Sequence, residues 1–433
     1  MYTIPQELID LSVDFLHDDA QALIRCCLAA KACLGRARYH LFRDVQLVFN
    51  PYRSAADDTV LRNFSSLLQV RSSLPPLGAI VRNLQIDGQT VCKPYRPAIE
   101  VQHIIEIISS LPNLEYVLFK RVVLKNSSQI GIPPTLFSLA TLAFCEFAAP
   151  ASIQGQSELF SAFLCCFSQI RHLYIDSPNW SRHPRDVTAP VLQPSSSRPL
   201  RIEEFSIFHR WECMQVDQLP PDFRPTSNIF RKIFPFSSLR SLSISVENDS
   251  LVHLKRIAEL LQECEPSLEV LTLDVVDIRW RIDPYSPDVW SIFNLPSLRK
   301  LHTLSIWPSL TLHPEHVETN IQYWSTIIDL LSSLSSCHLT SIELTVSVWP
   351  EDHFLGPAVT DDLTMLEQLQ WDKIRSTLRL LVSSGLEKLV ISVYLPREMR
   401  EGEDMLVEEN DTYVLNALRS LKVQVSVSHH FSG

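Results

Sequence analysis

Apolar residues recur along most of the chain in one short pattern, Leu-x-x-Leu-x-Leu, with Ile, Val or Phe in place of Leu at some positions. The final two apolar positions of each copy alternate with polar ones, and this alternation predicts a β-strand. The copies begin at Ile80, Leu114, Leu139, Ile170, Ile202, Leu239, Leu268, Leu301, Leu339, Leu386 and Leu418. A pattern repeated this often predicts a sheet built from similar strands.

Segments with helical periodicity separate several of these copies. They are Val101–Leu111, Ser157–Phe167, Leu254–Cys264 and Ile321–Leu334. Strand, helix and strand again, with parallel strands, is the unit of leucine-rich-repeat proteins, which this part of the chain resembles. Because the copies are longer and less regular than that family's, we expect an α/β fold in which residues 50–433 form an irregular leucine-rich-repeat solenoid. An ordinary doubly wound α/β domain is the alternative.

Three short helices are predicted ahead of these copies. Pro5 fits the first turn of the first helix, where its missing N–H costs nothing. Asp19 is placed to cap a second helix, which Gly35 would end. A third helix over Arg36–Phe42 runs into a strand-like segment, Val45–Phe49. So short a unit buries little apolar surface by itself, and such units are usually completed by a neighbour or a partner.

The ordered residues of this N-terminal unit resemble an F-box of the fungal type. The segments that carry the resemblance are Ile4-Pro5-Gln6-Glu7-Leu8, Val13, Leu16, Asp18-Asp19, Leu23, Cys26-Cys27-Leu28 and Ala37-Arg38-Tyr39-His40-Leu41-Phe42. Cys33 stands where the family often has tryptophan. The resemblance therefore makes residues 1–49 an F-box-like domain.

The resemblance also implies partners. In this family the motif docks on a small Skp-type adaptor, which a cullin scaffold holds, while the rest of the protein captures a target for ubiquitylation. The residues to which the resemblance assigns adaptor binding are Ile4, Pro5, Leu8, Val13, Leu16, Leu23, Leu28 and Cys33.

Composition and charge argue against several other classes of function. Only 9 glycines occur in 433 residues, too widely spaced for glycine-rich phosphate loops or the nucleophile elbow of α/β-hydrolases. The net charge of −11 has the wrong sign for binding nucleic acid. The chain opens without a basic segment followed by an apolar one and has no long apolar stretch, so we expect no signal peptide and no membrane partner.

Candidate metal and catalytic residues are equally scarce. The 10 cysteines include no Cys-x-x-Cys pair, which argues against a zinc site and a disulfide framework. His313 and His316 suit a metal poorly because Pro314 between them favours a helix start. We therefore predict no metal, no cofactor and no enzyme activity. The cysteine usage indicates a reducing compartment, and we expect the cytoplasm or the nucleus.

Tryptophans near predicted strand ends are the candidate target-binding residues. Trp280, Trp307 and Trp349 follow strands, where side chains would line one rim of a solenoid, and tryptophan is common in protein-binding hot spots. Packing of each tryptophan over its own apolar layer is the alternative. Residues 351–412 carry 6 Lys and Arg against 14 Asp and Glu, which favours a target with a basic patch.

These features together predict a non-catalytic substrate receptor that joins a Skp–cullin ubiquitin ligase to an unknown target protein. The alternative is a leucine-rich-repeat interaction scaffold that no longer binds the adaptor, and an α/β enzyme is a more distant third.

Overall fold

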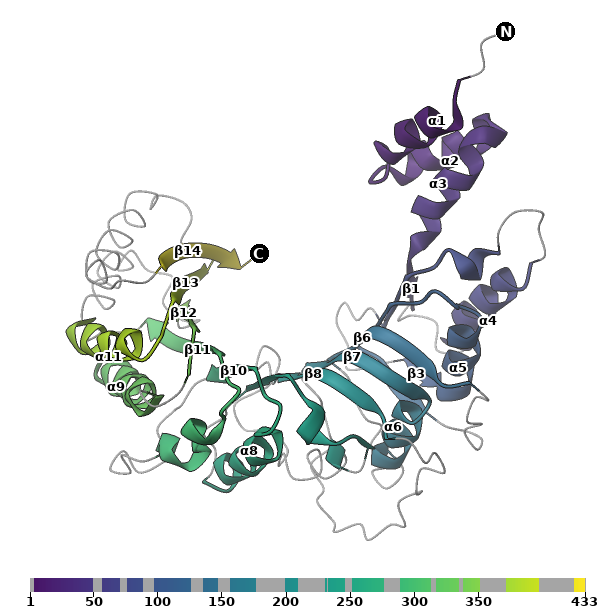
Figure 1. Cartoon of the computed structure of the whole chain (residues 1–433). Helices are drawn as coiled ribbons and strands as arrows, with labels where there is room; N and C mark the ends of the chain where they lie inside the picture. The colour runs from purple at the N-terminus through teal and green to yellow at the C-terminus, as the bar shows by residue number, and fades with distance from the viewer. Residues whose placement is uncertain are drawn as a thin grey trace. The chain divides into compact units, whose positions relative to one another are not determined.

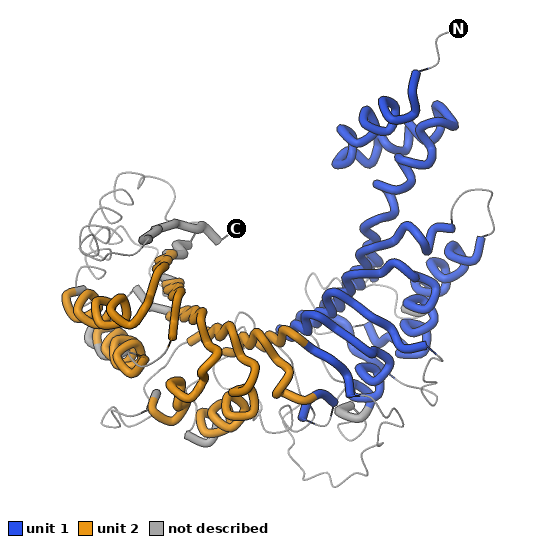
Figure 2. The backbone as a smooth tube through the Cα atoms, viewed as in Figure 1, with its two compact units in different colours: residues 1–202, 209–221, 228–234 blue, residues 203–208, 222–227, 235–433 orange. Residues whose placement is uncertain are grey.

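The protein is a mixed α/β molecule in which parallel strands alternate with helices (Figure 1). The chain divides into two compact units, one formed by residues 1–202, 209–221 and 228–234 and the other by residues 203–208, 222–227 and 235–433 (Figure 2). The computed structural model describes residues 4–49, 57–70, 76–88, 97–125, 135–146, 156–176, 199–208, 230–231, 233–245, 251–275, 289–312, 317–334, 338–350, 371–396 and 424–432.

Three helices open the first unit: α1 (Gln6–Asp14), α2 (Ala20–Ala29) and α3 (Lys31–Arg43). The predicted cap of the second helix is confirmed, because the Asp19 carboxylate accepts a hydrogen bond of 2.9 Å from the backbone N–H of Ala22. The prediction that this helix ends at Gly35 is wrong. Ala30 has an extended backbone (φ −149°, ψ 133°) and ends α2 early, so that Gly35 lies inside α3.

The sheet of the first unit contains five parallel strands that pair in the order of the sequence. They are β1 (Asp44–Val48), β2 (Asn83–Asp87), β4 (Tyr116–Lys120), β6 (Phe137–Cys145) and β7 (Phe167–Asp176). A separate parallel pair is formed by β3 (Ala98–Glu100) and β5 (Val123–Lys125). The helices are α4 (Asp57–Leu68), α5 (Val101–Ser109), α6 (Gln156–Leu164) and the 3-10 helix η1 (Leu77–Ala79).

The sheet of the second unit continues the same plan with parallel strands in sequence order. The strands are β8 (Arg201–Phe208), β9 (Ser241–Ser245), β10 (Val270–Val275), β11 (Thr303–Leu312), β12 (Ser341–Pro350), β13 (Lys388–Pro396) and β14 (Gln424–Ser432). The helices are α8 (Leu251–Cys264), α9 (Val317–Ser333), α11 (Trp371–Ser383) and the 3-10 helices η3 (Phe236–Ser238), η4 (Val289–Phe293) and η5 (Leu295–Ser297).

Apart from α1, α2 and α3, the helices of each unit lie on one side of its strands, and the core of each sheet lies between strands and helices (Figure 1). The last two apolar residues of a copy, such as Leu304 and Ile306, point into this core and are fully buried. In the first unit Phe144 stacks on Phe119, with ring centroids 5.1 Å apart, and meets Phe160 of α6 edge-on. We call the opposite side of each sheet, formed by the residues that alternate with these, the open face.

Ten of the eleven predicted copies supply a strand at the expected position, from β2 to β13. The last copy is misplaced. Leu389 pairs with Val425 and Ile391 with Val427, so β14 lies downstream of Leu418, and the predicted copy itself lies outside the described residues. The strand order never reverses within either unit, whereas a doubly wound sheet reverses its order at a switch point.

Candidate functional site

The three N-terminal helices share a small core of their own. Val13 of α1, Leu23 of α2 and Ala37 of α3 are buried together. Leu16, Cys26, Cys27, Cys33 and Leu41 pack around them and are partly buried. These helices therefore hold one another in place through a few apolar contacts.

A polar link on the surface adds to this packing. Arg36 Nη2 of α3 donates to the Asp14 carboxylate over 2.9 Å, and His40 Nε2 lies 2.7 Å from Asp14 Oδ1. The hydrogen bonds from Arg36 and then from His40 lower the pKa of Asp14 to about 2. The carboxylate at the end of α1 is thus held against α3 in its charged form.

The outer side of α1 is apolar and exposed. Leu8, Leu11 and Phe15 follow one another at helical spacing, so they share one face, and Ile4 lies just before the helix. The exposed fractions of Ile4, Leu8, Leu11 and Phe15 are 68%, 54%, 53% and 80%. On α2, Ile24 and Leu28 form a second stripe, one turn apart, with exposed fractions of 49% and 82%. We call these six residues the exposed apolar stripes. Isolated apolar side chains are common on surfaces, but aligned rows of large ones usually mark contact sites.

The residues assigned to adaptor binding fall into two sets. Ile4, Pro5, Leu8 and Leu28 are exposed and available to a partner. Val13 and Leu23 are buried, and Leu16 and Cys33 pack against them as part of the core of the helical unit. The structure therefore gives the second set a part in holding the helices together, while the first set remains a candidate contact surface.

Two of the three candidate target-binding tryptophans lie within strands. Trp307 is half-buried on the open face of β11, inside a strand that continues to Leu312 rather than just after its end. Trp349 belongs to β12, where its backbone pairs with Thr311. Trp280 lies outside the described residues.

Acidic residues at strand ends make structural contacts in the first unit. Asp87 ends β2 and is buried, and Arg121 Nη2 donates to its two carboxylate oxygens over 2.9 and 3.1 Å. Tyr174 donates to the buried Asp176 at the end of β7 over 3.5 Å. Such paired carboxylates are poor candidates for general bases, because their charge is already engaged.

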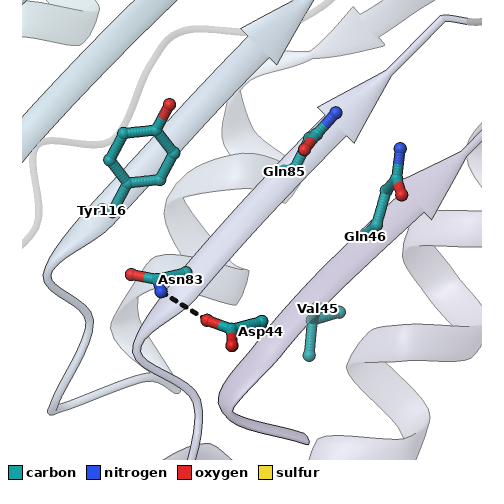
Figure 3. Close-up of a pocket in the computed structure, with 6 residues that line it drawn as sticks. All are labelled: Asp44, Val45, Gln46, Asn83, Gln85 and Tyr116. Carbon is teal, nitrogen blue, oxygen red and sulfur yellow. Dashed lines mark hydrogen bonds between the residues drawn. The ribbon is translucent and has the colours of Figure 1, made fainter. Parts of the chain in front are cut away.

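The open face of the first unit contains a shallow recess of about 500 Å³ at β1, β2 and β4 (Figure 3). Its lining residues are Asp44, Val45, Gln46, Asn83, Gln85 and Tyr116. Asn83 Nδ2 donates to Asp44 Oδ1, and the side chains of Gln46, Gln85 and Tyr116 project from the same side of the strands. Burial raises the pKa of Tyr116, so its phenol stays a neutral hydrogen-bond donor and acceptor. This lining can exchange hydrogen bonds with a ligand, but it offers no paired nucleophile and base.

The thiols of the buried residues Cys166 and Cys264 are weakly reactive. Burial raises the pKa of Cys166 and of Cys264 to about 12. Thiols with such values are almost wholly protonated at neutral pH and are weak nucleophiles. Within the described ranges, no cluster of His, Cys, Asp and Glu has the arrangement of a metal site, and His313 and His316 lie outside those ranges.

One pair of residues on the open face escaped prediction from the sequence. Phe208 occupies the same place in its copy as Trp307 does, directly after the last apolar position. The two rings stack, with centroids 5.8 Å apart and planes inclined by 10°. Aligning the copies would have identified Phe208 as the equivalent of Trp307. Only the assembled sheet shows that the two rings are in contact.

No family model matches the chain, and no curated protein matches it. Among the helices that the structure describes, none has the length and apolar character needed to cross a membrane. An assignment of function therefore has to be argued from the chain's own residues.

Proposed function

We propose that this protein is a non-catalytic substrate receptor of a Skp–cullin ubiquitin ligase in the cytoplasm or nucleus. Its N-terminal helices are an F-box-like unit that binds a Skp-type adaptor, and its sheets form an irregular leucine-rich-repeat array that binds a target protein. The observation that carries the proposal is the pair of exposed apolar stripes on α1 and α2. A unit this small does not keep six large apolar side chains in water without a partner to cover them.

Two further features support adaptor docking on this surface. The helices have a core of their own, built from Val13, Leu23 and Ala37, so the stripes are not needed to hold the unit together. Asp14 ties α1 to α3 through Arg36 and His40, which keeps the stripe on α1 in a fixed orientation. A preformed surface loses less conformational freedom on binding and therefore binds more tightly.

The test is co-purification of the full chain with a Skp-type adaptor after co-expression. Changing Ile4 and Pro5 together to alanine should remove the adaptor from the purified complex, because both side chains are exposed beside α1. Alanine keeps the Pro5 carbonyl that accepts from the backbone N–H of Leu8 over 3.1 Å, so the helix start is preserved. Thermal stability should be almost unchanged.

Leu380→Ala is the matched control, because Leu380 is a large apolar residue of α11 that is 58% exposed in the other unit. This variant should keep the adaptor. The proposal is wrong if the wild-type chain folds without binding the adaptor, a result that would favour the scaffold without adaptor binding. It is also wrong if the Ile4 and Pro5 variant loses stability, because the two residues would then belong to the core.

A further inference from the structure

Four neighbouring strands of the second unit bring together one row of side chains on the open face. Phe208 of β8 follows Ile207, which pairs with Ile244, so Phe208 and Ser245 are neighbours in the row. Asp274 of β10 pairs with Ser245 on one side and with Trp307 of β11 on the other. The row therefore runs from one aromatic ring to the other across a serine and an aspartate.

The two rings lean toward each other across the strands between them. Neighbouring strands are about 4.8 Å apart, so three steps place the backbones of Phe208 and Trp307 about 14 Å apart in a flat sheet. Their ring centroids are nevertheless only 5.8 Å apart. Ser245, which is almost fully buried, is small enough to lie beneath the pair. The result is an aromatic platform formed by Phe208 and Trp307.

Hydrogen bonds fix the parts of this platform. Trp307 Nε1 donates to Ser305 Oγ over 2.8 Å, which sets the orientation of the indole. Ser245 Oγ donates to Asp274 Oδ2 over 2.9 Å, which sets the orientation of the carboxylate beside the indole.

Negative charge lies on both sides of the indole. Asp274 is on β10, and Glu343 is on β12, where it pairs with Ser305; both are half-buried. On this open face, Glu204 of β8, Asp274 of β10 and Glu343 of β12 supply carboxylates. An aromatic face flanked by carboxylates attracts a cation through the ring quadrupole and through charge. A planar guanidinium fits better than an ammonium, because it can stack on an indole and bind a carboxylate through two N–H groups.

We propose that the Phe208–Trp307 platform, together with Asp274, binds an arginine side chain of a target protein. The arginine lies on the indole and donates hydrogen bonds to the Asp274 carboxylate, while the rest of the target segment follows the open face of the second unit. This inference deepens the proposed function, since it names the chemistry of the target that the receptor would recognise.

The experiment measures binding of two fluorescent peptides to the full chain by anisotropy. One is a Gly/Ser peptide that contains arginine, and the other has citrulline, the neutral isostere, at the same positions. Wild type should bind the arginine peptide about tenfold more tightly, as expected for a cation on an aromatic ring beside a carboxylate. The preference should decrease as salt rises.

Variants test whether the preference for the arginine peptide depends on the Phe208–Trp307 platform and Asp274. Trp307→Ala and Asp274→Asn should each remove most of it, whereas Trp307→Phe should retain much of it because a ring is still present. Glu106→Gln is the charge-matched control, since Glu106 is exposed on α5 of the first unit, and it should change nothing. Circular dichroism spectra and melting temperatures show whether each variant is folded.

Equal binding of the two peptides by wild type, or a preference that survives Trp307→Ala, would overturn the arginine site. Co-purification with the Skp-type adaptor distinguishes this failure from failure of the proposed function. If wild type binds the adaptor but does not discriminate between the peptides, only the arginine site is wrong. If it discriminates between the peptides but never binds the adaptor, the arginine site stands and the ligase assignment is wrong.

Discussion

Two leucines of the same helix should respond in opposite ways to truncation. Leu23 and Leu28 both belong to α2, but Leu23 is 1% exposed in the core of the helical unit and Leu28 is 82% exposed. Replacing each with alanine removes the same atoms from the same helix. The comparison therefore isolates the effect of burial from the effects of residue type and helix propensity.

The magnitudes follow from burial. Leu23→Ala removes a side chain packed against Val13 and Ala37 and leaves a cavity, which typically costs about 2–5 kcal/mol. Leu28→Ala removes a side chain that is mostly in water, and such surface changes usually stay within about 0.5 kcal/mol. Since about 1.4 kcal/mol corresponds to a factor of ten, the first change should raise the population of the opened helical unit by roughly 30-fold or more.

Hydrogen–deuterium exchange of the full chain measures this opening in peptides that cover α1, α2 and α3. Leu23→Ala should accelerate exchange across the three helices together, and Leu28→Ala should leave it nearly unchanged. Peptides from α5, in the sheet-forming part of the chain, serve as the internal control in both variants. Equal acceleration by the two substitutions would refute the division between core and contact surface on which the proposed function depends.

Asp14→Asn should remove a pH dependence that the wild type shows in acid. Because hydrogen bonds from Arg36 and then from His40 depress the folded pKa of Asp14 to about 2 from 3.8, its stabilising contribution is present above the unfolded value and is lost as the pH falls toward 2. The difference in urea midpoint between wild type and Asp14→Asn measures this stabilising contribution. A difference that grows as the pH falls toward 2 would contradict the prediction. Gly78→Ala should destabilise the chain by about 1–3 kcal/mol, because a Cβ at Gly78 would lie 2.1 Å from a backbone carbonyl oxygen. Gly35→Ala in α3 meets nothing within 4 Å and should instead stabilise it by about 0.5–1 kcal/mol, so equal denaturation midpoints for the two alanine variants would disprove this explanation.

The strands of both sheets could be predicted because their signal is local. A residue such as Leu304 alternates with polar neighbours over a few positions, and that alternation suffices to mark a strand with one face in a core. The prediction failed at Leu418, where several apolar residues allow more than one frame. The pairing of Leu389 with Val425 shows which frame the strand uses. Strand pairing arises only in the assembled sheet, so the local sequence does not reveal it.

Of the helix boundaries at the N-terminus, the local sequence likewise predicted one correctly and another wrongly. Asp19 could be identified as a cap because its partner is only three residues away. Gly35 misled the prediction, since a glycine is permitted but not required to end a helix. The extended backbone of Ala30 makes the actual break, and no residue type at that position announces it.

The sequence by itself determined the class of fold and most strand positions. It could not say which side of α1 is buried, because Leu8, Leu11 and Phe15 repeat with the same helical period as Ile9, Val13 and Leu16, and only packing against α2 and α3 decides between them. The tertiary structure alone brought Phe208 to Trp307. Contacts between residues so distant in sequence depend on the order and register of strands, which arise from the packing of the whole sheet rather than from any local pattern.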